Sequence, residues 1–273
     1  MDFEWYLDRF KRELRTHGRS QNTIDKYEEI LRRMDAELPC GVLRACTDEL
    51  EDWIWIDGRK PATLGLYRTV ASAFFTFATD EVALAGDRLD LNPARYLPKV
   101  KKPRRTPRPA QQDQLRDILA RAREPYRTWF IIAAGAGLRC VDLSLLDRED
   151  CTAEALHVVG KGGVERTVFT HPEVWRVIEP LPSGPICRTA DGRRATARQV
   201  QVRGNTHLRR LGYRLTMHKL RSYFGTELHE AAGGDILITQ EQMGHSEPST
   251  TRIYVLTNRR KAASAVAAIP LPV

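Results

Sequence analysis

Apolar residues recur at every third or fourth position through most of this chain, the spacing that lines them up on one face of an α-helix. In the first hundred residues this pattern predicts four helices, over residues 3–16, 23–38, 48–56 and 62–80. The stripe of the first is made of Phe3, Tyr6, Phe10 and Leu14. Asn22 is a candidate N-cap for the second helix. Such stripes are typical of a packed core, so we expect residues 1–97 to form an all-helical domain.

A proline-rich segment, PKVKKPRRTPRP at residues 98–109, follows this domain. It carries four prolines and six cations without an acidic residue. Proline disfavours a helix there, and charges of like sign extend a chain, so we expect a linker. Its sequence fits equally a solvated loop and a strap that contacts a nucleic-acid backbone.

The pattern changes after the linker, where two short strands interrupt the helices. The strands are expected within residues 155–171, on either side of the turn GKGG at residues 160–163. Helices are expected after Gly137 and over residues 110–123, 125–135, 195–211, 217–231 and 250–257. The predicted fold class is therefore mainly α with a small β-sheet, in two domains: the all-helical one and a mixed α+β domain at residues 110–258. Residues 259–273 are expected to form a tail with a helix and an apolar end.

The composition of the 273 residues excludes several classes of protein. No stretch approaches 18 consecutive apolar residues, and the N-terminus is acidic and amphipathic. We therefore expect no transmembrane helix and no signal peptide, and a cytoplasmic location. The five cysteines form no CxxC pair and are expected to be reduced thiols.

The net charge of +8 indicates a polyanionic partner. Its distribution is uneven. Residues 1–97 carry 14 Lys and Arg against 18 Asp and Glu, a net charge of −4, and residues 98–109 carry +6. Residues 110–273 carry 23 against 17, again +6. The positive excess thus lies in the linker and in the second domain.

The segment TMHKLRSYFGTELHE, residues 216–230, places two nitrogen-rich side chains at the start of a helix. With Thr216 as N-cap, His218 and Arg221 share one face of the first turns. The N-terminus of a helix presents free N–H groups and partial positive charge, so it favours a bound phosphate. A phosphate site and an ordinary solvated helix start are both open for this segment.

Arg139 follows a glycine turn in an otherwise apolar run, IIAAGAGL. An arginine in such surroundings is costly unless it is paired, and Asp142 is placed to orient it. A buried structural ion pair is one interpretation. In the other, Arg139 and Arg221 together grip one phosphate in bidentate fashion, which lysine cannot do.

Three further residues are candidates for proton transfer or attack. Lys161 lies in the glycine-rich turn, where it is either solvated or able to reach a leaving oxygen as a general acid. GHSEPSTTRIY, residues 244–254, places His245 and Tyr254 in a segment too polar to be core. Either His245 and Tyr254 take part in the chemistry, or the segment is an ordinary surface turn followed by a helix.

Several reaction classes have no matching pattern in the sequence. We find no paired carboxylates, acidic metal box, Walker loop or Ser-His-Asp order, so we expect neither a metal nor another cofactor. The candidates instead combine groups that stabilise negative charge with one hydroxyl nucleophile. That combination suits attack on a phosphodiester.

The chain resembles the tyrosine recombinases of the phage integrase family. The resemblance rests on GLRCVDL, the lysine of VVGKGGVERTV, HKLRSYFGT and GHSEPSTTRIY, which follow one another in the family's order and spacing. SQNTIDKYEEILRRM and LNPARYLPKVKKPRR resemble its core-site-binding domain and interdomain linker. Ser222 departs from the pattern, since the family often has a second histidine there.

The resemblance implies a role for each candidate. Tyr254 would be the nucleophile, Arg139 and Arg221 would clamp the scissile phosphate, and Lys161 would protonate the leaving 5′ oxygen. His218 and His245 would assist with hydrogen bonds and proton transfer. The resemblance also implies double-stranded DNA recombination sites as substrate, a homo-tetramer on DNA that resolves a Holliday junction, an accessory directionality or host factor, and a tail that docks on a neighbouring subunit.

The first helix begins near residue 3, so the arm-site-binding domain of larger integrases is not expected. This favours a compact phage or mobile-element integrase, with a Xer-like dimer resolvase as the alternative. A catalytically idle DNA-binding relative, a type IB topoisomerase-like enzyme and a metal-dependent nuclease also stay open.

Overall fold

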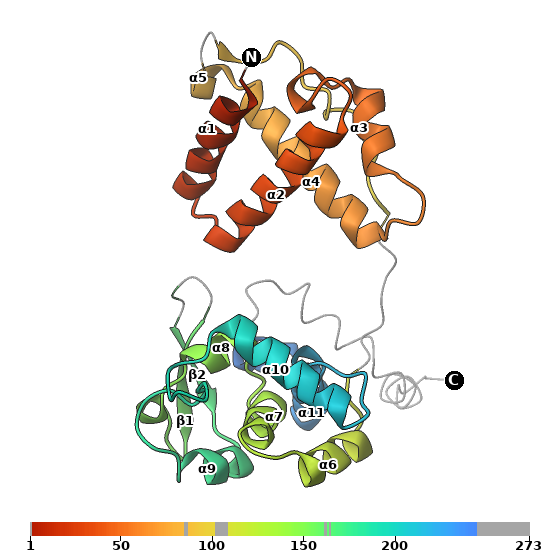
Figure 1. Cartoon of the computed structure of the whole chain (residues 1–273). Coiled ribbons are helices and arrows are strands. Elements are labelled where there is room, and N and C mark those ends of the chain that lie inside the picture. Colours follow the sequence, from red (N-terminus) through yellow and green to blue (C-terminus); the bar gives the residue numbers. More distant parts are fainter. Residues whose placement is uncertain (1, 85–86, 102–108, 161–162, 164, 245–273) are drawn as a thin grey trace, which may run out of the picture. The chain divides into compact units, whose positions relative to one another are not determined.

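The computed structural model describes residues 2–84, 87–101, 109–160, 163 and 165–244. The expected helix at residues 250–257 and the tail at residues 259–273 lie outside these ranges. The chain forms two compact units, Met1–Arg104 and Arg105–Val273, each with its own hydrophobic core (Figure 1). No helix in the described ranges combines the length and the apolar character needed to cross a membrane.

The first unit is helical throughout its described residues. Its elements are α1 (Phe3–Thr16), α2 (Gln21–Glu37), η1 (Val42–Arg44), α3 (Thr47–Ile54), α4 (Pro61–Ala78) and α5 (Glu81–Leu84). The four helices expected here are present, with ends shifted by at most two residues. The N-cap of α2 is Ser20 and not Asn22.

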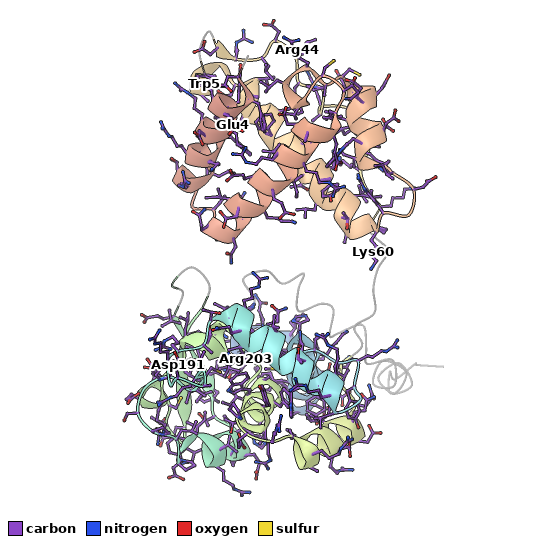
Figure 2. The ribbon with its side chains drawn as sticks, in the orientation of Figure 1. Glu4, Trp5, Arg44, Lys60, Asp191 and Arg203 are labelled. Atoms are coloured by element: carbon purple, nitrogen blue, oxygen red, sulfur yellow. The ribbon has the colours of Figure 1, made fainter. Side chains whose placement is uncertain are left out.

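The apolar stripes of the first unit meet where α1, α2 and α4 pack together. Phe10 of α1 packs edge-on against Phe74 of α4, with 5.5 Å between ring centroids. At the surface, Glu4 of α1 (Figure 2) pairs with Arg32 of α2, at 2.9 Å between Oε2 and Nη2. The aromatic stripes are therefore core, as expected.

The second unit joins a helical cluster to one hairpin. Its elements are α6 (Gln112–Arg121), α7 (Tyr126–Gly135), α8 (Cys140–Leu145), η3 (Arg148–Asp150), β1 (Ala155–Val159), β2 (Glu165–Phe169), α9 (Pro172–Ile178), α10 (Ala197–Arg210), α11 (Met217–Ala231) and α12 (Ile236–Met243). The mainly α fold class with a small sheet is confirmed. The helices α9 and α12 were not expected from the sequence.

Helix α7 is the centre of the second unit, with every residue from Thr128 to Ala134 buried. It packs against α6, α8, α9, α10 and α11 (Figure 1). This all-round burial explains its nearly continuous apolar sequence, YRTWFIIAAG.

The two strands pair antiparallel, with Val158 opposite Arg166 and Leu156 opposite Val168. Leu156, Val158 and Val168 are buried and alternate with exposed residues, so one face of the hairpin packs inward. That face lies against α8 and α12. The hairpin therefore stands beside the residues that follow the Gly137 turn.

Candidate active site

A left-handed glycine sets the geometry of the site. Gly137 follows α7 with φ of +63°, and a Cβ at this position would overlap the ring of Phe224. Only glycine meets both conditions without strain. The turn places Arg139 at the N-cap of α8 and leaves the carbonyl oxygen of Gly137 to accept a hydrogen bond from Nη1 of Arg221.

Arg221 lies in the first turns of α11, and its residue is only 2% exposed. Its Nη2 donates to the carbonyl oxygen of Met243, the last residue of α12, at 2.6 Å. The guanidinium thus joins the turn after α7 to the end of α12. Buried arginines need such partners because an unpaired buried charge is strongly unfavourable.

Arg139 reaches the same place from α8. Its Nη2 donates to the carbonyl oxygen of Gly244 at 2.9 Å, one residue beyond the acceptor used by Arg221. Unlike Arg221, it is partly accessible, with 38% of its side chain exposed. The two guanidiniums therefore converge on the C-terminal end of α12, and Arg139 is the one that solvent can reach.

Asp142 stands between them and is fully buried. Its Oδ2 accepts from the backbone N–H of Arg139 at 3.0 Å, a capping bond at the start of α8 that fixes the backbone of this arginine and not its guanidinium. The same oxygen lies 4.0 Å from Nη1 of Arg139 and 3.9 Å from Nη1 of Arg221. The closest cation to it is Arg166 of β2, whose Nη2 lies at 2.6 Å.

Three guanidiniums thus surround one carboxylate, which leaves a net charge of +2 around Asp142. A partly buried group of guanidiniums is suited to an anion such as a phosphate group, because guanidinium N–H groups match phosphate oxygens.

His218 lies on α11 one turn before Arg221, as the sequence predicts. Although the residue is exposed at the surface, desolvation by the surrounding protein lowers the pKa of its imidazole. The positive charges of Arg221, Lys219 and Arg139 act in the same direction. Near pH 7 the imidazole is therefore neutral, with one nitrogen able to donate a hydrogen bond and one able to accept a proton.

Thr216 occupies the N-cap position of α11, but its side chain makes no capping hydrogen bond. The backbone N–H of Met217 is instead bonded to Oδ1 of Asn205 in α10, at 2.8 Å. Ser222, the departure from the family pattern, is buried and donates to the carbonyl oxygen of His218 at 2.9 Å. Its hydroxyl is thus used inside α11.

The structure brings together three of the six candidates: Arg139, His218 and Arg221. Lys161, His245 and Tyr254 lie outside the described residues. Lys161 follows Gly160 in the connection between β1 and β2, and His245 directly follows Gly244. The roles of all six residues stay predictions.

Arg166 is not among the candidates predicted from the sequence. Its position could have indicated a role, because Arg166 shares the inward face of a predicted strand with Val168, and a cation on that face needs a buried partner. Among the residues that the structure describes, His, Cys, Asp and Glu side chains form no cluster of three or more that could hold a metal ion.

Comparison with known proteins identifies the family. The model of the phage integrase family matches residues 109–261. Tyrosine recombinase XerC of Haemophilus influenzae is 28% identical over 278 residues, which cover 93% of this chain and 91% of XerC. Tyrosine recombinase XerA of Pyrococcus horikoshii is 26% identical over 276 residues, which cover 95% and 92%.

Solved structures share the fold. A lambda integrase (75–356) dimer bound to a COC′ core site superposes with a TM-score of 0.74 at 21% identity, covering 92% of this chain and 97% of that one. XerH site-specific recombinase bound to a palindromic difH substrate gives a TM-score of 0.71 at 17% identity, covering 92% and 81%. Because the family match spans more than half of the sequence and includes Arg139, His218 and Arg221, the chain belongs to the phage integrase family of tyrosine recombinases.

Proposed function

We propose that this tyrosine recombinase is an integrase, which moves a phage or other mobile element by cleaving and rejoining duplex DNA at specific sites. The observation that supports the cleavage chemistry is the convergence of Arg139 and Arg221 on one oxygen of Asp142, where these side chains and Arg166 sum to a charge of +2. A scissile phosphate placed beside these guanidiniums would neutralise part of that charge.

In the proposed cleavage step, the hydroxyl of Tyr254 attacks the phosphorus and the bond to the 5′ oxygen breaks. The tyrosine proton passes to a neighbouring base, with His218 and His245 as candidates, and Lys161 protonates the departing 5′ oxygen. A phenol has a pKa near 10, so its proton has to leave as attack proceeds. The products are a 3′-phosphotyrosyl bond and a free 5′ hydroxyl.

Arg139 and Arg221 would stabilise the charge that gathers on the non-bridging oxygens of the pentacoordinate phosphate. Preorganised donors aimed at developing charge supply much of an enzyme's acceleration. The covalent intermediate conserves the phosphodiester bond energy, so the free 5′ hydroxyl of a second duplex can attack it in reverse. This mechanism needs neither ATP nor a metal ion.

Strand exchange requires more than one subunit, and we propose a homo-tetramer on two DNA sites that passes through a Holliday junction. A lambda integrase tetramer bound to a Holliday junction shares the fold, with a TM-score of 0.74 at 21% identity, which supports this arrangement. We propose that residues 110–258 carry the chemistry, and that residues 259–273 dock on a neighbouring subunit. An accessory or host factor that sets direction is part of the proposal.

Residues 1–97 are proposed to bind the core site and residues 98–109 to follow the DNA backbone as a linker. The net charge of −4 in residues 1–97 means that binding there depends on local cations. Arg33 and Arg59 lie over the rings of Trp53 and Tyr67, at 5.0–6.0 Å from the ring centroids, and Arg33 is also paired with Glu37 at 2.9 Å.

The decisive experiment uses nicked suicide duplexes made from the DNA that flanks the gene. The full chain should form a protein–DNA adduct that survives denaturation, and Tyr254→Phe should abolish the adduct while binding persists. Tyr96→Phe, which removes the hydroxyl of an exposed tyrosine in the first unit, is the matched control and should keep the adduct. Binding without any adduct in the unaltered chain would favour an idle DNA-binding relative.

Further arms of the experiment distinguish the recombinase from a nuclease and from a topoisomerase. Adduct formation should be unaffected by EDTA, whereas a metal-dependent nuclease would lose activity. Duplexes with two sites should yield recombinants, whereas a type IB topoisomerase-like enzyme would relax supercoils without exchange.

A Xer-like dimer resolvase is the second candidate. The similarity to XerC over 91% of that protein's length favours it. Exchange between two copies of one chromosomal site would support the resolvase, and exchange between the two ends of a flanking element would support the integrase.

A further inference from the structure

We propose that Arg166 is a positioning residue that pairs with Oδ2 of Asp142 and so keeps Arg139 and Arg221 out of hydrogen-bond distance of that oxygen. The inference rests on the proposed function, because it concerns how that site is prepared for phosphate. It assigns a role to a side chain that the predicted catalytic set does not contain.

The distances around Oδ2 of Asp142 carry the proposal. Nη2 of Arg166 lies at 2.6 Å, within the range of a charge-assisted hydrogen bond, while Nη1 of Arg221 and Nη1 of Arg139 lie at 3.9 and 4.0 Å. The guanidinium that touches Oδ2 is the one outside the predicted catalytic pair, and Oδ1 has no hydrogen-bond partner among the described residues. Without Arg166, the net charge of the cluster would fall from +2 to +1, and the carboxylate would draw the other two guanidiniums inward.

The position of Arg166 is fixed from three elements. The side chain is 13% exposed, on the inward face of β2 opposite Val158, and it meets α8 through Asp142. Its Cδ, Nε and Cζ cover Gly244, where a Cβ would come within 2.7–2.9 Å of them. Strand β2 is joined to α12 again by the backbone N–H of Phe169, which donates to Oε1 of Gln242 at 2.9 Å.

The same contacts connect the hairpin to the rest of the site. The connection that contains Lys161 begins after Val159 and ends before Glu165, next to Arg166 in the sequence. Gly244, beneath the Arg166 guanidinium, accepts from Arg139 and precedes His245. The contacts of Arg166 therefore have a second effect: they hold β2, the strand that follows Lys161, against the arginine pair.

The kinetic test compares Arg166→Met with the unaltered full chain in single-turnover adduct formation on a nicked duplex. Methionine keeps a long apolar stem and removes the charge. We expect the rate constant to fall about 100-fold, the effect of misplacing reacting groups by about 1 Å, with little change in the Kd for DNA. Arg176→Met, which removes an exposed arginine of an i,i+3 pair on α9, is the matched control and should leave both constants unchanged. A weaker Kd with an unchanged rate constant would mean that Arg166 contacts DNA, which overturns the proposal.

A second substitution tests the electrostatic cause. In the double variant Asp142→Asn/Arg166→Met the carboxylate of Asp142 is no longer there to capture Arg139 and Arg221, so we expect the double variant to be faster than Arg166→Met alone. A residue that only stabilises the fold would give the opposite order. If Arg166→Met does not fold, Arg166→Lys decides, because it keeps the charge beside Asp142 and should retain most of the rate constant. If Arg166→Lys lowers the rate constant as much as Arg139→Ala does, the proposal is contradicted.

A crystal structure of DNA-free Arg166→Met, or of Arg166→Gln if methionine prevents folding, gives an answer that does not depend on catalysis. We expect Nη1 of Arg139 or of Arg221 to move to about 3 Å from Oδ2 of Asp142, a hydrogen-bond distance. If both stay near 4.0 Å, the inference fails even when the enzyme is active. If the unaltered chain forms no adduct, the proposed function fails, and this distance still decides the role of Arg166.

Discussion

Arg139 and Arg221 donate to the carbonyl oxygens of consecutive residues, Gly244 and Met243, although Arg139 caps α8 and Arg221 lies in α11. Both also lie within 4.0 Å of the same oxygen of Asp142. The two arginines are thus parts of one arrangement, and a change in either one alters the surroundings of the other.

This relationship predicts that their contributions to cleavage are not additive. Arg139→Lys and Arg221→Lys should each lower the single-turnover rate of adduct formation by about 10²–10³, because lysine keeps the charge but loses the paired N–H donors. The double variant should be only slightly slower than the worse single variant, since groups that act as a unit show non-additive losses. Multiplied losses in the double variant would indicate two independent anion sites.

A second prediction concerns the turn at Gly137. Gly137→Ala combines an unfavourable φ with overlap against Phe224, so we expect a loss of about 2–5 kcal/mol in the free energy of unfolding. Gly192 also has a positive φ, of +78°, but nothing lies within 4 Å of its Cβ position, so Gly192→Ala should cost only about 1–2 kcal/mol. Urea unfolding of the two variants measures the difference. Equal losses would mean that the Phe224 contact does not matter.

The third prediction is a dependence of stability on pH from His207. This residue of α10 is 5% exposed and stacks on Tyr126 at 4.4 Å between ring centroids, and neither ring nitrogen has a hydrogen-bond partner among the described residues. Burial lowers the pKa of His207, and the positive charges of Arg123 and Arg210 lower it further.

The unfolded chain therefore binds a proton at His207, near the ordinary pKa of 6.5, before the folded chain does. The stability of the unaltered protein should fall as pH drops from about 6.5 toward the lowered pKa of the folded state. His207→Phe has no side chain that titrates in this range. As pH falls below about 6.5, the free energy of unfolding of His207→Phe minus that of the unaltered protein should therefore increase, relative to the same difference above pH 7. A difference that is constant with pH would contradict this prediction.

The fourth prediction concerns the linker. If residues 98–109 follow the DNA backbone, replacing four of its cations by glutamine should weaken binding and reduce its dependence on salt; these are Lys101, Lys102, Arg104 and Arg105. For every phosphate that the variant no longer contacts, the slope of log K against log salt should become shallower by about 0.9. Titration of a labelled duplex at several salt concentrations measures this slope.

The control for the linker variant replaces four exposed cations that already have acidic partners: Lys26, Arg121, Arg176 and Arg193. It changes the net charge by the same amount, and its slope should change less. Equal changes in the two variants would show that the overall charge, and not the linker, sets the affinity.

Elements with a strong apolar stripe could be predicted from the sequence, and those that bury polar residues could not. Helix α1 has a stripe of large apolar residues and was expected with its observed bounds. Helix α12 buries Thr239, Gln242 and Met243, so its sequence contains no apolar stripe to recognise. The short helix α9 begins three residues after the last residue of β2, and its N-cap His171 falls within the range where the strands were expected.

The site divides in the same way. Arg139, His218 and Arg221 stand in local motifs, and the capping bond between Asp142 and the backbone of Arg139 follows from the place of Asp142 three residues after Arg139. The contact between Asp142 and Arg166 joins residues 24 positions apart, and the acceptors at Met243 and Gly244 are backbone atoms, which no motif displays. The recombinase family is confirmed, while the roles of all six candidate residues stay predictions.

Gly244 ends α12 in a left-handed conformation, with φ of +58°, and is held at the arginine pair through its carbonyl oxygen. Tyr254 is ten residues further along the chain. Ten residues span at most about 35 Å, so the phenol of Tyr254, the predicted nucleophile, would be a tethered reactant whose local concentration at the arginine pair does not depend on how much protein is present. An insertion before Tyr254 would then dilute this predicted nucleophile without altering a side chain of the arginine pair.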